Sequence, residues 1–204
     1  MNQVLEKQDT KQRILDSAER LFANHGVDAT SLRTIIMDAK VNLAAIHYHY
    51  HSKEALLDAV LGRRLEPVNR ERLQMLDKCG EKASLEAVLD AFIAPAMRVE
   101  GPFVRLMGRI IVEGDQLPRL IKQHFGVVLK RFMNALHQAA PGLPPAELFW
   151  RMHFTVGAMA HTLRSSHDME QISGGICDAS DAAAVTRRLV HFVAAGFRSE
   201  VDHV

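Results

Sequence analysis

Long apolar runs are missing from this sequence. No stretch approaches the roughly 18 residues that mark a membrane-spanning helix, and the first residues lack the pattern of a secretory signal peptide. Hydrophobic residues nevertheless make up 48% of the 204 residues, which is ample for a buried core. The composition therefore predicts a soluble globular protein, and we expect it in the cytoplasm.

Cysteine is also scarce. Cys79 and Cys177 lie far apart in the sequence, and neither belongs to a Cys-x-x-Cys pair, so the sequence indicates neither a zinc ribbon nor a redox motif. In the cytoplasm we expect both to be ordinary reduced thiols.

Recognisable catalytic motifs are absent as well. The sequence has no Gly-rich phosphate loop, no His-Glu-x-x-His pair and no nucleophile elbow. Ser166, His167 and Asp168 are neighbours in sequence, which does not place their side chains in a triad. We expect a protein that is not an enzyme and needs no cofactor. An all-helical enzyme with a site built from distant residues is the weaker alternative.

An excess of positive charge is missing too. The net charge is +1, and residues 1–60 hold seven Lys and Arg against eight Asp and Glu. Binding to nucleic acid would therefore depend on where single charges lie, with weak non-specific affinity and reliance on two correctly spaced half-sites.

Residues 31–50 are the most informative part of what is present. They predict two short helices, with Ser31 as the N-cap of the first and a break at Lys40. The apolar residues at helical spacing are Leu32, Ile35, Ile36 and Ala39 in the first helix and Val41, Ala44, Ala45 and Ile46 in the second. A helix anchored by small residues packs closely on its neighbour, so its outer side is free to enter a DNA major groove about 12 Å wide.

Together with residues 10–26, this segment resembles the DNA-binding domain of the tetracycline-repressor (TetR) family of bacterial transcription regulators. The match covers residues 10–61 as several ordered parts. These are an Ile-Leu-x-x-Ala-x-x-Leu-Phe stripe, a helix-ending Gly26, Thr30-Ser31, the turn, the aromatic second helix and Ser52-Lys53-Glu54-Ala55-Leu56. The resemblance implies a three-helix DNA-binding domain with a helix-turn-helix at residues 1–61.

The resemblance also implies roles for single residues. Phosphates are expected against Thr30, His47 and Lys53, and bases or their sugars against Arg33, Asn42, Leu43, Ala44, Ala45 and Tyr48. Phosphate contacts set the register on DNA, and base contacts set the sequence preference.

Three positions depart from the family pattern. Lys40 stands where the family usually has a turn glycine, Ile36 where it has alanine and His47 where it has tyrosine. A left-handed Lys40 costs about 1 kcal/mol. The larger Ile36 is expected to tilt the second helix and change the preferred operator, while His47 still donates to phosphate.

The remaining chain, residues 62–204, is predicted to be a helical ligand-binding and dimerisation domain, which gives an all-α protein of about nine helices. A helix from Ser52 is expected to kink or break at Pro67, and another from about residue 84 to end before Pro95. A further apolar stripe follows Gly101-Pro102, and Pro118 is expected to open one long helix that runs to residue 140.

The last two helices bear on assembly. Residues 148–160 are apolar on nearly every side, residues 182–197 are rich in small residues, and Ser173-Gly174-Gly175 forms a flexible loop between them. Pairing both helices with their symmetry copies makes a four-helix interface, so we expect a homodimer. Burial within a thick monomeric core is the alternative.

Residues 139–154 and 193–200 resemble, more loosely, the PsrA-like, fatty-acid-responsive subgroup of the same family. This implies a small apolar effector such as a fatty acid or acyl derivative. Flexible and aromatic residues suit such a ligand, although at helical spacing they are more often plain core. They are Met97, Phe103, Met107, Phe125, Phe132, Met133, Trp150, Phe154 and Met159.

An acidic head group would need a charged or hydrogen-bonding partner. The candidates are Arg105, Arg109, His124, Arg151 and His153, each of which is more often a solvated or internally paired residue.

Metal binding or sensing through His47-x-His49-x-His51 is the other alternative. On a helix only His47 and His51 share a face, which leaves a tetrahedral zinc site incomplete. The sequence therefore favours a regulator, most simply a repressor, that binds a palindromic operator in double-stranded DNA as a dimer and is released by its effector.

Overall fold

The computed structural model describes residues 2–113, 117–166 and 168–200. The side chains of residues 2–8, 43, 112 and 113 lie outside this description. Every regular element in the described residues is a helix, which confirms the all-α prediction. Contacts divide the chain into an N-terminal unit, Met1–Glu66 with Glu100–His124, and a C-terminal unit, Pro67–Val99 with Phe125–Val204. Because two segments form each unit, a domain boundary after residue 61 stays a prediction.

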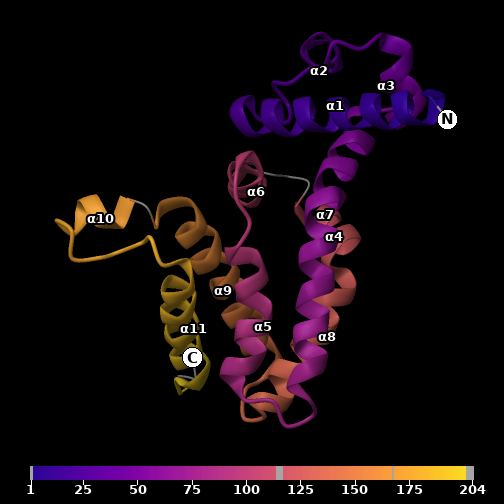
Figure 1. The fold of residues 1–204 in the computed structure, drawn as a ribbon. Coiled ribbons are helices and arrows are strands. Elements are labelled where there is room, and N and C mark those ends of the chain that lie inside the picture. The colour runs from indigo at the N-terminus through magenta and orange to yellow at the C-terminus, as the bar shows by residue number, and fades with distance from the viewer. Residues whose placement is uncertain (1, 114–116, 167, 201–204) are drawn as a thin grey trace. The chain divides into compact units, whose positions relative to one another are not determined.

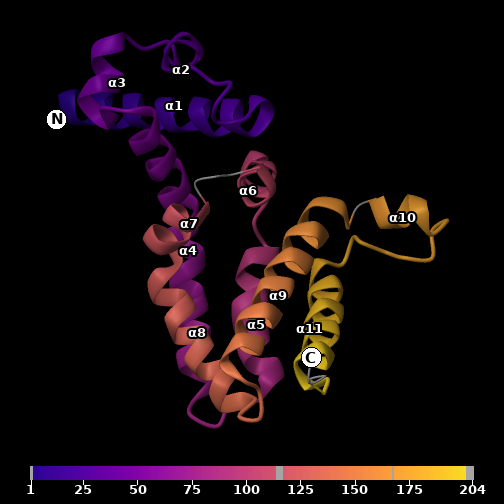
Figure 2. The same cartoon turned by 180° about the vertical axis from the view of Figure 1, so that it is seen from behind.

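The N-terminal unit is built around α1 (Asn2–His25). On one side of α1 lie α2 (Leu32–Ala39) and α3 (Leu43–Tyr50), and on the other lies α6 (Pro102–Glu113) (Figures 1 and 2). The predicted apolar stripe of α1 forms the centre of the unit, with Ile14, Ala18 and Phe22 fully buried. Gly26 ends α1 at a φ of 86°, a backbone conformation that favours glycine.

Helix α4 (Lys53–Cys79) is continuous through Pro67, so of the expected kink or break, the break is wrong. Proline removes one helical hydrogen bond, to the carbonyl four residues earlier. Pro67 is exposed, and buried residues lie along α4 on both sides of it, from Leu56 to Leu76, so the loss of one hydrogen bond does not end the helix. As a result α4 contributes residues to both units.

The C-terminal unit is centred on α5 (Leu85–Met97), which packs against α8 (Gly126–Ala139), α9 (Pro145–Ser165) and α11 (Ala182–Arg198). Ser84 caps α5 by accepting from the backbone N–H of Ala87 at 3.2 Å. The expected end of this helix before Pro95 is wrong. Residues 85 and 88–97 are buried apart from Asp90, so burial on several sides keeps the last turn helical past the proline.

The long helix expected to begin at Pro118 is present, but it is not uniformly α-helical. The structure has α7 (Leu117–Leu120), a π-helical segment (Ile121–Phe125) and then α8. If these three are taken as one interrupted helix, the described residues form ten helices where about nine were predicted. The additional one is the short α10 (Asp168–Ile172), which projects from the α9–α11 pair in both views (Figures 1 and 2).

Among the described residues, none of the helices has the length and apolar character needed to cross a bilayer.

Candidate nucleic-acid interface

Helices α2 and α3 are each capped by a side chain at the N-terminal end. The Ser31 hydroxyl accepts from Thr34 N at 3.0 Å, which confirms the predicted N-cap of α2, and Asn42 Oδ1 accepts from Ala45 N at 2.8 Å at the start of α3. Lys40 ends α2 with a φ of 53° and a ψ of 48°. This left-handed conformation explains why glycine is usual at the position.

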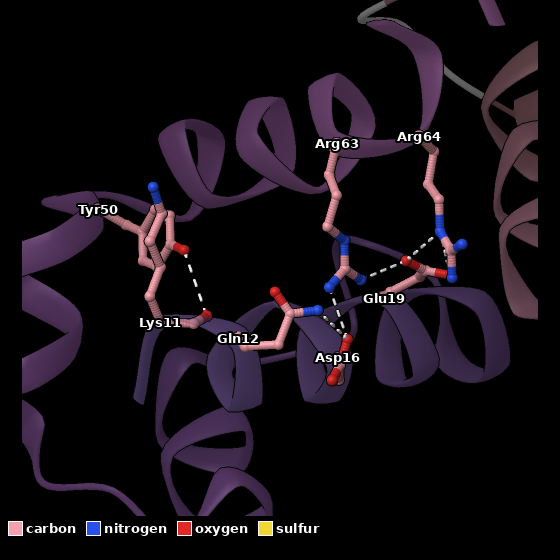
Figure 3. Close-up of polar contacts among 7 residues, drawn as sticks. All are labelled: Lys11, Gln12, Asp16, Glu19, Tyr50, Arg63 and Arg64. Atoms are coloured by element: carbon pink, nitrogen blue, oxygen red, sulfur yellow. Dashed lines mark hydrogen bonds and ion pairs between the residues drawn. The ribbon is translucent and has the colours of Figure 1, made fainter. Parts of the chain in front are cut away.

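Helix α3 presents one buried and one exposed side. Ile46 and Tyr50 are buried, and the Tyr50 hydroxyl donates to the Lys11 carbonyl at 3.5 Å (Figure 3). Burial raises the pKa of Tyr50 to about 12. Tyr48 is 67% exposed, whereas Tyr50 is 5% exposed. The two tyrosines therefore have opposite environments on one short helix.

Five of the predicted DNA contacts are exposed on α2, on α3 and at the turn between them, and we call them the reading face. They are Arg33, Asn42, Ala44, His47 and Tyr48. Ala45 is half-buried beneath them, and the side chain of Leu43 lies outside the described residues. Because the side-chain oxygen of Asn42 caps α3, its side-chain NH₂ group is the part that can donate to a base.

Two predicted phosphate contacts are engaged within the chain. Thr30 is buried, and its hydroxyl donates to the Gly26 carbonyl at 2.7 Å. The Lys53 ammonium donates to the carbonyls of Val27 and Asp28 at 3.1 and 3.3 Å. Both side chains fasten the loop between α1 and α2, so the Thr30 hydroxyl is a poor phosphate donor in this arrangement. Their phosphate roles stay predictions.

A cluster of charged side chains joins Arg63 and Arg64 of α4 to α1 (Figure 3). The buried carboxylate of Glu19 accepts from Arg63 at 2.5 Å and from Arg64 at 2.8 Å. Arg63 also donates to Asp16 at 2.6 Å, and the hydrogen bond to Glu19 raises the pKa of Arg64. Removing either arginine would leave charge on the buried carboxylate uncompensated, which is strongly destabilising. The sequence signal that could have indicated this cluster is Glu19, an acidic residue within the apolar stripe of α1.

The head-group candidates have partners within the chain. Arg105 and Arg109 donate to Asn24 at the end of α1, and His124 lies 3.7 Å from Asp58. Arg151 donates to the carbonyls of Gly196 and Ser199, capping α11, and pairs with Glu147; His153 is exposed beside Trp150. These placements favour structural roles.

The residues predicted to line an effector pocket are divided. Phe103 and Met107 belong to α6 in the N-terminal unit. Met97, Phe132, Met133 and Met159 lie in or against the core of the C-terminal unit, and Phe125 is half-buried at the start of α8. Trp150 and Phe154 are exposed on α9, so within one chain they do not line an enclosed pocket. The assignment as a set stays a prediction.

Exposed aromatic side chains lie on α9 and α11. The exposed fractions are 57% for Trp150, 62% for Phe154 and 73% for Phe192, and Phe149 is exposed as well. The rings of Trp150 and Phe154 stack with centroids 5.9 Å apart. Several large exposed aromatics on two adjacent helices are typical of a protein–protein contact.

Among the described residues, no three His, Cys, Asp or Glu side chains are grouped so that they could hold a metal ion. His47 and His49 lie on α3, and His51 follows it with a φ of 55°, off the helical path. The described geometry therefore gives no support to the metal-binding alternative.

A capped two-helix motif with a projecting second helix defines a helix-turn-helix protein. Residues 14–60 match the family model of the tetR family of bacterial regulatory proteins, and residues 90–196 match that of tetracyclin repressor-like C-terminal domains. The second match alone covers more than half of the chain. The chain therefore belongs to the TetR family, whose members are DNA-binding regulators and not enzymes.

Two curated relatives illustrate the similarity. The transcriptional regulator SrpR of Pseudomonas putida is 30% identical over 134 residues, which are 65% of this chain and 60% of SrpR. The nicotine-responsive transcriptional repressor HdnoR of Paenarthrobacter nicotinovorans is 33% identical over 87 residues, 42% of this chain and 45% of HdnoR. The chain thus matches less than two thirds of the length of either relative.

Solved structures share the fold. The TetR-family regulator SCO4454 of Streptomyces coelicolor superposes with a TM-score of 0.62 at 18% identity, over 94% of this chain and 95% of that one. A tetR-family regulator from Shewanella sp. PV-4 gives a TM-score of 0.65 at 19% identity, over 88% and 96%.

Proposed function

We propose that this protein is a transcriptional repressor that binds a palindromic operator as a homodimer and leaves it when an effector binds. The observation that carries the proposal is the two-sided α3, on which buried Ile46 and Tyr50 hold the helix while Tyr48 projects. A helix held in this way presents fixed side chains to a major groove.

In the proposed DNA complex, the bases and their sugars are contacted by Arg33, Asn42, Ala44 and Tyr48 of the reading face, joined by Leu43 and Ala45. Thr30, His47 and Lys53 lie against phosphates, and the Thr30 hydroxyl also fastens the loop between α1 and α2. The net charge of +1 gives little general attraction to DNA. Affinity for the operator therefore depends on both half-sites being occupied at once.

The proposed dimer forms through α9 and α11. Trp150, Phe154 and Phe192 supply the exposed aromatic area that a two-fold interface buries, and the four helices form a bundle with their copies. Such a dimer holds two reading faces about one turn of DNA, roughly 34–36 Å, apart.

Release from DNA requires an effector that binds more tightly to a conformation of the dimer in which the spacing of the two reading faces does not match that of successive major grooves. By linkage, DNA then weakens effector binding by the same factor that the effector weakens DNA binding. We propose that helix α4 transmits the change, because it begins directly after α3 and contributes residues to both units. The methionines and aromatic residues of the C-terminal core suit an apolar effector, which we propose is a fatty acid or acyl derivative.

The test is selection of the full-length protein against random duplex DNA, followed by mobility-shift titration of the enriched sequence. We expect an inverted repeat whose affinity falls sharply when one half-site is scrambled. Enrichment of no sequence, or of a single unrepeated site bound by a monomer in light scattering, contradicts the proposal.

A further inference from the structure

Arg72 on α4 is a buried charge in the C-terminal unit. Its exposed fraction is 2%, and it lies against residues of α5 and α9. Arg72 falls at helical spacing with the apolar Val68 and Leu76, which is a sequence signal of burial, but it is absent from the predicted head-group candidates.

The partners that the structure places around its guanidinium are neutral. Nε donates to the Phe92 carbonyl at 2.8 Å, Nη1 to Asn69 Oδ1 at 3.1 Å, and Nη2 faces the Met159 sulfur at 4.0 Å. The guanidinium carbon also lies 4.3 Å from the centroid of the Phe92 ring. A thioether at 4.0 Å is a weak acceptor, so one edge of the guanidinium is poorly matched.

No carboxylate among the described residues compensates the charge. In the described part of the C-terminal unit, acidic side chains that form ion pairs do so with other arginines: Glu71 with Arg98, Asp77 with Arg131, Glu86 with Arg198, Glu147 with Arg151 and Asp181 with Arg187. Burial lowers the pKa of Arg72 to about 10, and no acid opposes that shift. The group therefore remains positively charged at neutral pH within an apolar core.

The hydrogen bond from Arg72 on α4 to the Phe92 carbonyl does not require a charged side chain, because a neutral amide could donate it as well. Burying a guanidinium without an anion is costly, and natural proteins seldom do so without a further reason. An anion that arrives with a ligand supplies the missing partner.

We propose that Arg72 binds the carboxylate of an effector that is acidic at one end and apolar elsewhere. The inference rests on the proposed ligand-released function and names the chemistry of its ligand. The carboxylate accepts from the two terminal nitrogens, which now meet Asn69 and Met159, while Nε keeps its bond to Phe92. A monoanion matches the single positive charge, whereas a phosphate monoester would bring a second, unpaired one into the core.

Room for the ligand comes from side chains that change shape readily. Met159 is in contact with Arg72, and Met97, Met133 and Met152 lie in or against the same core. Unbranched thioether side chains adapt to a new neighbour at low cost. The apolar part of the effector takes their place beside the edge-to-face pair of Phe92 and Phe132.

The experiment compares acids with matched alcohols. Full-length wild-type protein is titrated by calorimetry with straight-chain carboxylates from hexanoate to hexadecanoate, and with the primary alcohol of each length, below micellar concentrations. We expect at least one acid to bind about tenfold or more tightly than its alcohol, since an alcohol cannot form the charge-assisted bidentate hydrogen bonds of a carboxylate.

Three variants assign that preference to one residue. In Arg72→Met the acid is expected to bind no better than the alcohol, while the ligand-free protein unfolds at the same or a higher temperature, because an uncompensated charge has been removed. Arg72→Lys keeps the charge and should keep part of the preference. The matched control, Arg131→Met, changes an exposed arginine of the same unit and should behave as wild type.

The inference is overturned if no acid outbinds its alcohol, or if Arg72→Met keeps the preference. Should Arg72→Met fail to fold, loss of all preference in Arg72→Lys together with a lower unfolding temperature assigns Arg72 a structural role and likewise overturns it. Operator binding measured on the same wild-type preparation separates the two proposals. A protein that binds its operator but no acid retains the proposed regulatory function with another effector, whereas one that binds no DNA lacks that function itself.

Discussion

The guanidinium of Arg13 donates a 2.9 Å hydrogen bond to the backbone oxygen of Lys40, the left-handed residue that ends α2. The backbone N–H groups of Lys40 and Val41 donate to carbonyls of the preceding helical turn. Since the Lys40 side chain is exposed, these backbone contacts and not its packing hold the turn. The family-typical glycine is thus replaced by a lysine whose strain is offset by neighbours.

Replacing Lys40 by glycine is expected to stabilise the protein. Glycine adopts this conformation without a steric cost, so the free energy of unfolding should rise by about 0.5–1 kcal/mol. Urea denaturation measures the change. Lys40→Ala, which keeps the strain, should gain nothing, and a destabilised glycine variant would show that the lysine side chain has a role of its own.

Tyr48→Ala is expected to weaken operator binding about tenfold or more, because each half-site then lacks one base-edge interaction worth roughly 1 kcal/mol or more. Its position on the exposed side of α3 means that the fold and the dimer should persist. Mobility-shift titration and light scattering on the same sample separate these effects. Tyr50→Phe, altered only at the buried hydroxyl, is the control and should bind as wild type. A Tyr48→Ala protein that is monomeric would make Tyr48 structural.

Lys53→Met tests whether an ammonium already bound to the α1–α2 loop also reaches DNA. If it does, the slope of log affinity against log salt concentration should become shallower by about 0.9 for each protomer. If Lys53 only fastens the carbonyls of Val27 and Asp28, unfolding becomes easier while the slope stays the same.

Phe154→Arg is expected to dissociate the dimer, because a charge placed in an apolar two-fold interface meets its own copy or an unpaired desolvated site. The weight-average mass in light scattering should fall to that of one chain, with operator affinity falling in parallel. Val127→Arg places the same charge on an exposed apolar position of α8 and should leave the dimer intact. An unaffected Phe154→Arg dimer would place the interface elsewhere.

Asp58 gives a pH dependence of known sign. Burial raises the pKa of its carboxyl, but hydrogen bonds from Arg119 and Gln123 outweigh burial and leave the pKa below its usual value of 3.8. A lowered folded-state pKa stabilises the protein above the unfolded-state pKa, and the contribution is lost as the pH falls through the folded-state pKa. The destabilisation caused by Asp58→Asn should therefore be full near pH 6 and shrink towards pH 3. If the stability difference between wild type and Asp58→Asn is constant from pH 6 to pH 3, the charge of the Asp58 carboxylate does not cause it.

Local signals in the sequence predicted local structure well. Ser31 and Ser84 precede helices and cap them, and Gly26 ends α1, because such positions depend on a few neighbouring backbone groups. The rule that proline ends a helix fails at Pro67 and Pro95, both of which lie inside helices. Packing along α4 and around α5 outweighs the loss of one hydrogen bond, and a local rule does not contain that contribution.

The partners of charged residues could not be predicted from the sequence. Glu19 meets arginines that are 44 and 45 positions away, and Arg72 meets a carbonyl 20 positions away, so only the folded chain reveals which of them is compensated. Likewise, the apolar pattern of α9 does not tell which of its side chains the chain itself buries, and the structure leaves Trp150 exposed. The helix-turn-helix was predicted because its signals lie within some 20 adjacent residues, where spacing alone is informative.

Trp150 is the only tryptophan in the chain. Its indole stands on the exposed side of α9, far along the sequence from residues 1–66, which contain none. If the proposed interface on α9 forms, the tryptophan emission should move to shorter wavelengths as the ring leaves water. No label is needed, and no second tryptophan interferes.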